Sequence, residues 1–183
     1  MIRFTKCENH WDLAKAYWVT GIDGAKFDRR HYIHTLHIDS GVAVKTDGSR
    51  LHAACFSTDI PDGDYEIIKR TKSEVVINRV ESKDWADWES VLEIMPKTVY
   101  HNNKYSYCLF CKSGDSGGMV GYFYYQMANN GLLGWFNADF VADVLSGFEN
   151  AYALVWISED NNSPLFVFDE NLDRVAAVMP RRV

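Results

Sequence analysis

Short runs in which apolar and polar residues alternate, separated by turn-forming residues, dominate the chain. This period of two is typical of half-buried β-strands, and pairs such as Asp47-Gly48 and Asp62-Gly63 mark the turns between them. The pattern predicts strands at residues 1–6, 32–38, 42–46, 50–56, 65–70, 74–80, 99–111, 119–127, 153–158, 165–169 and 174–179.

Two segments have the helical period instead. The first covers residues 10–20, with Asn9 as N-cap, Asp12 near the positive end of the helix dipole and Gly21 as the stop. The second covers residues 137–148, with Asn137 as N-cap and Asp139 in the first turn. Its apolar stripe consists of Phe140, Val141, Val144, Leu145 and Phe148.

The order of these elements suggests a weak duplication of a strand–helix–three-strand unit. We therefore expect an α+β fold with antiparallel sheets and two helices on one face. The expected organisation is a single domain, residues 1–183, built of a first unit (1–83), a connector (84–96) and a second unit (97–183). Two small domains are the alternative.

Composition narrows the class of protein. The 183 residues are 47% hydrophobic and 24% charged, as in ordinary globular chains, so no metal or disulfide is needed for folding. A net charge of −6 excludes a simple basic nucleic-acid binder. No apolar stretch approaches about 20 residues, and the first residues lack a signal-peptide pattern, so we expect a cytoplasmic protein without membrane contact.

One string invites a catalytic interpretation. Gly114-Asp-Ser-Gly-Gly118 resembles the nucleophile loop of serine proteases, which would make Ser116 the nucleophile of a hydrolase. That chemistry needs a histidine base and an aspartate, and His52 has no clear aspartate partner. A hairpin turn is the favoured interpretation, and we expect no enzyme activity.

Metal and cofactor sites are also disfavoured. Cys108 and Cys111 have zinc-like spacing but no second pair, and on a strand they point to opposite faces. His31, His34 and His37 recur every three residues in a segment that we predict to be a strand, where His34 faces away from the other two. No glycine-rich phosphate loop occurs, and we expect no cofactor.

Several segments, in order along the chain, resemble those of bacterial sliding clamps, the β subunit of DNA polymerase III. The segment 41–52 (GVAVKTDGSRLH) resembles the clamp "ATDGHRL" motif, and 136–145 (FNADFVADVL) resembles the clamp helix start. The tail 177–183 (AVMPRRV) resembles the "VVMPMRL" terminus. Ser163-Pro164 and the stretch from Asp87-Trp88 to Pro96 match a strand entry and the interdomain connector.

The resemblance implies a DNA-clamp-like fold without enzyme activity, and a role as a processivity factor in DNA replication or repair. In that family these segments bind short hydrophobic peptides of polymerases and repair proteins. Carried over by position, the peptide pocket would consist of Thr46, Gly48, Arg50, Leu51, Pro96, Asn137, Phe140, Ser163, Val178, Met179, Pro180 and Arg182. Here Ser49, Phe140 and Arg181 replace the family's usual histidine, tyrosine and apolar residue.

Clamps encircle double-stranded DNA and self-assemble into rings of six similar domains, so the resemblance also implies a homo-oligomer. The expected DNA contacts are Lys15, Lys26, Arg29 and Arg30, since lysine and arginine bind phosphates without reading sequence. The second helix offers only Asp139 and Asp143, which would repel DNA. The alternatives are therefore two pared-down clamp domains, and a solitary adaptor or decoy that binds peptides without encircling DNA.

Overall fold

The computed structural model describes residues 1–6, 10–24, 27–93, 107–113, 119–125, 131–148, 154–157, 164–169 and 171–180. Its helices are α1 (His10–Val19), α2 (His31–His34), α3 (Trp88–Glu93) and α4 (Ala138–Ser146). Its strands are β1 (Ile2–Thr5), β2 (Leu36–Asp39), β3 (Val42–Thr46), β4 (Arg50–Cys55), β5 (Gly63–Thr71), β6 (Glu74–Arg79), β7 (Tyr107–Ser113), β8 (Met119–Tyr125), β9 (Gly131–Asn137), β10 (Leu154–Ile157), β11 (Leu165–Phe168) and β12 (Arg174–Val178).

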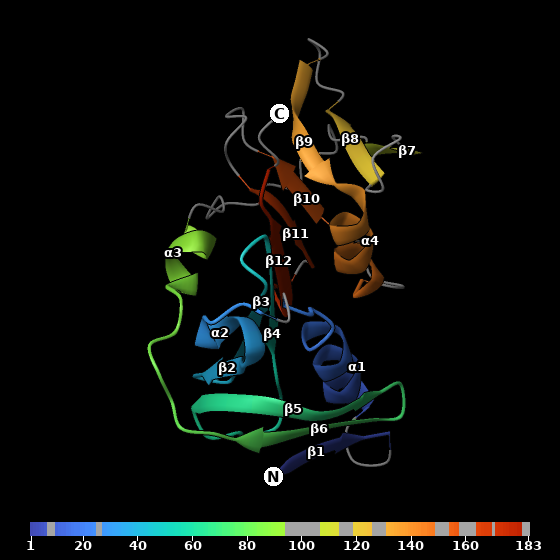
Figure 1. Ribbon diagram of the computed structural model, residues 1–183. Coiled ribbons are helices and arrows are strands. Elements are labelled where there is room, and N and C mark those ends of the chain that lie inside the picture. The colour runs from blue at the N-terminus through green and yellow to red at the C-terminus, as the bar shows by residue number, and fades with distance from the viewer. Residues whose placement is uncertain are drawn as a thin grey trace.

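Nine of these strands form one antiparallel sheet in the order β1-β6-β5-β2-β3-β4-β12-β11-β10. The strands β7, β8 and β9 form a second antiparallel sheet. In Figure 1 the long sheet runs from β1 beside the N-terminus to the red strands β10–β12. The pairing of β4 with β12 joins the early and late parts of the chain. The antiparallel sheets and the few helices together confirm the predicted α+β fold class.

Both predicted helices form. Asn137 is the N-cap of α4, and its side-chain oxygen accepts a hydrogen bond of 2.9 Å from the Asp139 amide, as predicted. In α1, Asp12 is fully buried, and its carboxylate accepts hydrogen bonds from the backbone and side chains of Ser57 and Thr58. Asp12 therefore ties α1 to the loop after β4, a role beyond the predicted interaction with the helix dipole.

The predicted strand at residues 32–38 is wrong in its first half. Residues His31–His34 form the single turn α2, and the strand β2 begins only at Leu36. One helical turn has too few positions to show a period of its own. The segment that contains the three histidines is therefore helical at His31 and His34 and extended at His37.

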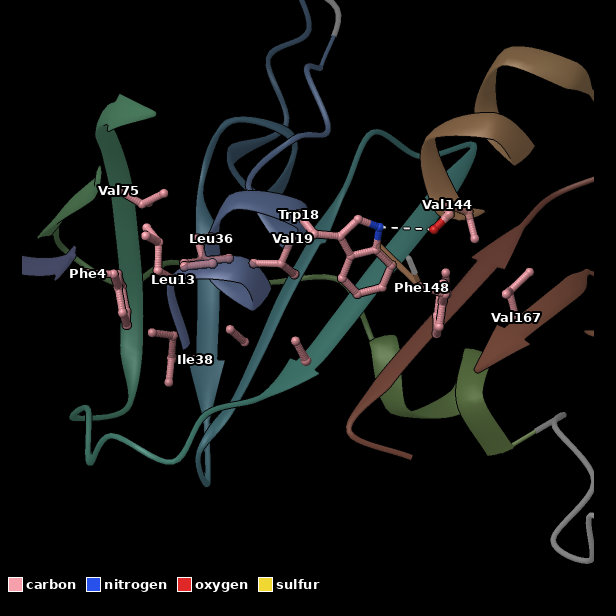
Figure 2. Packing of buried hydrophobic residues seen from close by; sticks show 14 of the residues in the cluster. Phe4, Leu13, Trp18, Val19, Leu36, Ile38, Val75, Val144, Phe148 and Val167 are labelled. Carbon is pink, nitrogen blue, oxygen red and sulfur yellow. Dashed lines mark hydrogen bonds between the residues drawn. The ribbon is translucent and has the colours of Figure 1, made fainter. Parts of the chain in front are cut away.

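Each face of the long sheet has its own apolar core. On one face α1 and α4 cover a cluster that extends from Phe4 and Leu36 to Val167 (Figure 2). On the other face α3 packs against a smaller cluster that includes Leu51 and Phe166. Figure 1 shows α3 on the opposite side from α1 and α4.

Trp18 of α1 joins the two helices. Its indole nitrogen donates to the Val144 carbonyl on α4 at 3.1 Å, and its ring meets Phe148 edge-on with centroids 5.3 Å apart (Figure 2). Gly147 makes this approach possible, since a Cβ there would lie 2.3 Å from the indole nitrogen. The two expected units are thus in direct contact through one buried side chain.

Among the described residues, no helix combines the length and apolar character needed to cross a membrane. The Gly114–Gly118 string lies outside the described residues, so the turn and hydrolase interpretations of Ser116 both stay predictions. Cys108 and Cys111 lie on β7, within a segment predicted to be a strand.

Candidate functional site

The pairing of β4 with β12 brings the predicted pocket residues together. Arg50 is opposite Val178 in the register, and Leu51 is opposite Ala177. Beyond the last pair, the Met179 amide donates to the Ser49 carbonyl at 2.8 Å, so the ladder continues past the end of β12. The start of one strand and the end of the other therefore form one edge-to-edge junction.

The turn between β3 and β4 has a defined conformation at this junction. Gly48 has a φ of +85°, a value that L-residues with a side chain rarely adopt. The Thr46 hydroxyl donates to the Arg50 carbonyl at 2.7 Å and accepts from the Gly48 amide at 3.0 Å. The Asp47 carboxylate accepts from the amides of Ser49 and Arg50. These contacts fix the backbone that precedes Leu51.

Arg50 is the electrostatic centre of the junction. Only 7% of the residue is exposed, and its guanidinium pairs with Asp47 at 3.0 Å and with Asp143 of α4. The same group lies 4.4 Å from the ring centre of Phe140. Because two carboxylates and one aromatic face surround the cation, Arg50 holds α4 against the start of β4.

The opposite face of the junction is apolar. Leu51 and Ala177 lie side by side there with Phe166 and Phe168, and α3 of the connector packs against them through Trp88, Val91 and Leu92. These α3 side chains are only half-buried. At the end of β12, Met179 leaves 43% of its surface exposed beside the half-buried Pro180. The junction therefore combines exposed apolar surface with a rigid backbone.

The predicted pocket residues divide into three groups. Those that meet at the junction are Thr46, Gly48, Arg50, Leu51, Phe140, Val178, Met179 and Pro180. Asn137 lies one turn from Phe140, as the N-cap of α4. Pro96, Ser163 and Arg182 lie outside the described residues. The assignment of a peptide pocket to these residues remains a prediction.

Comparison of the sequence with models of known protein families gives no match, and comparison with curated proteins gives none either. Solved structures do match over the whole chain. A DNA polymerase sliding clamp from Pseudomonas aeruginosa, crystallised with a ligand, superposes with a TM-score of 0.57 at 20% identity, and 67% of that chain is covered. The sliding clamp from Bacillus subtilis gives 0.56 at 12%, with 64% covered. The polymerase III β subunit from Borrelia burgdorferi gives 0.59 at 10%, with 62% covered.

The chain has the sliding-clamp fold. It spans about two thirds of the length of the clamps that it matches. The β4–β12 junction lies inside the region that superposes, because the match covers 100% of this chain.

The basic residues expected to contact DNA differ in their surroundings. Lys15 is buried, donates to the Cys55 carbonyl at 2.7 Å and pairs with Asp173 at 3.4 Å. Arg30 pairs with Asp28 at 2.6 Å and keeps half of its side chain exposed, and Arg29 is exposed. Lys26 lies outside the described residues. The assignment of DNA contacts therefore stays a prediction. Of the expected contacts that the structure describes, Arg29 and Arg30 are accessible and Lys15 is buried.

His52, the only base considered for a hydrolase, lies in the core of this clamp fold. Its ring stacks on Trp18 with centroids 4.3 Å apart, and Nδ1 lies 3.3 Å from the Trp18 carbonyl. Burial lowers the pKa of His52 to about 3, so the imidazole is neutral and its Nδ1–H donates to that carbonyl. Its Nε2 has no hydrogen-bond partner among the described residues.

Two polar clusters escaped the sequence analysis. The pair of Arg50 with Asp143 joins residues that are far apart in sequence, and Asp143 entered the analysis only as a negative charge on a helix. The second cluster joins His31 and His37 to Asp64. The strand interpretation left these two histidines on one face, with His34 turned away, but it identified no carboxylate between them. The described residues contain no group of three or more side chains able to hold a metal ion.

Proposed function

We propose that this chain is a sliding-clamp-like accessory protein of DNA replication or repair, which acts without catalysis by binding short apolar peptide segments of partner proteins. The observation that carries the proposal is the β4–β12 junction. It assembles residues from the early and late parts of the sequence into one place, and those are residues that the clamp resemblance assigns to peptide binding.

The chemistry of the junction suits such a ligand. Apolar anchors of a peptide bind where exposed apolar side chains are surrounded by a rigid and partly polar frame. Met179 supplies exposed apolar surface, while the turn at Gly48 and the ion pairs of Arg50 hold the frame. A preformed frame lowers the ordering cost of binding.

Replacing Met179 with alanine is expected to weaken peptide binding by about fivefold to thirtyfold, the effect of losing one apolar anchor contact worth about 1 to 2 kcal/mol. The measurement is fluorescence anisotropy of a labelled short peptide with leucine and phenylalanine anchors. The chain offers a matched control, Leu172→Ala, since Leu172 is 44% exposed and lies in the turn before β12, at its other end. Equal affinity of both variants, or no binding by the unsubstituted protein, would contradict the proposal.

One observation favours the second candidate function, an adaptor that binds peptides without encircling DNA. The helices that would face DNA in a clamp ring carry little available positive charge. The Lys15 ammonium is committed to Asp173 and the Cys55 carbonyl. The helix α4 has no lysine or arginine and exposes Asp139, while its Asp143 is paired with Arg50. Such a surface repels phosphates.

We therefore expect duplex DNA to bind no more tightly than the roughly 10⁻⁴ to 10⁻⁶ M typical of sequence-independent contacts. Binding should fall further in the double variant Arg29→Ala/Arg30→Ala. Anisotropy of a labelled duplex at low and physiological salt measures both effects. Tight binding that survives physiological salt, accompanied by self-association in sedimentation, would support an encircling ring instead of an adaptor.

A further inference from the structure

A buried carboxylate bridges two histidines beside the connector. Asp64 of β5 is fully buried, and its oxygens lie 2.9 Å from Nε2 of His31 and 2.7 Å from Nδ1 of His37. Burial alone would raise the pKa of Asp64, but hydrogen bonds from His37, the Lys83 amide and His31 outweigh it and lower that pKa. An ionised carboxylate only accepts hydrogen bonds, so both of these ring nitrogens carry protons.

The same cluster holds the chain where it passes from β6 into the connector. The Lys83 amide donates to Asp64 at 3.1 Å. Two residues later, the indole of Trp85 donates to the Thr35 hydroxyl at 3.2 Å, and its ring stacks on His37 with centroids 5.1 Å apart. Figure 1 shows the connector passing α2 and β2 on its way to α3. His37 thus lies in contact with both Asp64 and Trp85.

The other charged groups around the cluster have partners of their own. Lys45 of β3 is buried, which lowers its pKa to about 8, and its ammonium donates to the Ile33 carbonyl of α2 and not to Asp64. Arg79 of β6 donates to the Asp62 carbonyl. Before α2, Arg30 pairs with Asp28, and His34 bonds to the Asp28 carbonyl. Within the described part of the chain, no lysine or arginine pairs with Asp64. The histidines are therefore the groups that can neutralise this buried charge.

We propose that His31, Asp64 and His37 form a proton-operated latch for the connector, in which uptake of a proton by the histidines tightens residues 83–85 against α2 and β2. Protonation of one ring adds a hydrogen to its far nitrogen and leaves the existing N–H groups of both rings bonded to Asp64. It neutralises the buried carboxylate and places a cation against the Trp85 ring. Imidazole is the side chain that ordinarily changes its charge between about pH 5 and 8. The inference does not depend on peptide binding.

Hydrogen exchange of the Lys83 amide and the Trp85 indole, followed by NMR on the full chain, tests the latch. After correction for intrinsic exchange rates, both protons should be protected about threefold to tenfold more at pH 6 than at pH 8. The variant Asp64→Asn keeps an acceptor but removes the charge, and it should abolish this difference. His37→Gln should reduce it, and it carries the test alone if Asp64→Asn does not fold.

His34→Gln is the matched control. His34 lies on the same helical turn as His31 but bonds to the Asp28 carbonyl at 2.5 Å and not to Asp64. It should leave the pH dependence unchanged. Equal protection at the two pH values in the unsubstituted protein would overturn the proposal, as would a pH dependence that persists in both Asp64→Asn and His37→Gln.

Discussion

Replacing Trp18 with alanine is expected to lower the free energy of unfolding by about 3 to 5 kcal/mol, the range for loss of a large buried aromatic side chain. Trp18 is 5% exposed, stacks on His52, meets Phe148 edge-on and donates to the Val144 carbonyl. Because these contacts join α1 to α4, the loss affects both expected units at once. Urea unfolding, followed by far-ultraviolet circular dichroism, measures the change.

Trp88→Ala provides the comparison, since Trp88 is half-buried on the other face of the sheet and should cost less. A second variant makes the test specific. Gly147→Ala should destabilise the unsubstituted protein, because the new Cβ meets the Trp18 indole, but should cost little when Trp18 is already alanine. A destabilisation below about 1 kcal/mol for Trp18→Ala, or additive effects of the two substitutions, would contradict the claim that packing of Trp18 holds α1 against α4.

Acid is expected to destabilise the protein through His52. Its pKa is about 3 in the folded protein, against an ordinary value near 6.5, so only the unfolded chain binds a proton at this site between those values. Stability must then fall as the pH drops below 6.5, by about 2 kcal/mol between pH 7 and pH 5. The physical cause is the cost of placing a charged imidazole in the core beside Trp18.

The variant His52→Gln isolates this contribution, because glutamine keeps a donor for the Trp18 carbonyl and does not titrate. The difference in unfolding free energy between the two proteins should shrink by about 2 kcal/mol as the pH falls from 7 to 5. Taking this difference removes the contributions of His31 and His37, which both proteins share. A constant difference over that range would show that His52 is not buried as a neutral ring.

The sequence predicts a helix well where the segment is long enough for its period to repeat. The apolar stripe of α4 and its N-cap Asn137 follow from the helical period and from the need of the first-turn amides for an acceptor. The turn α2 could not be found this way, since His31–His34 is a single turn within a segment that otherwise suits a strand. The difference lies in the length of the two helices, since α4 has nine residues and α2 has four.

The candidate site shows the same division. The resemblance to clamp motifs selected Arg50, Leu51 and Met179, but no periodicity could show that β4 pairs with β12, because pairing between distant strands leaves no local signal. The partners of Asp64 and Arg50 are likewise set by the tertiary fold. Sequence reasoning therefore identified residue types at the junction, while their ion pairs required the structure.

The most direct test of the central claim, that residues 46–51 and 178–180 form one peptide site, is NMR mapping. The ¹⁵N-labelled chain would be titrated with an unlabelled peptide that carries leucine and phenylalanine anchors. The account predicts that amide signals of residues 46–51 and 178–180 shift together, with a common dissociation constant. Shifts confined to one of these segments, or located away from both, would contradict it.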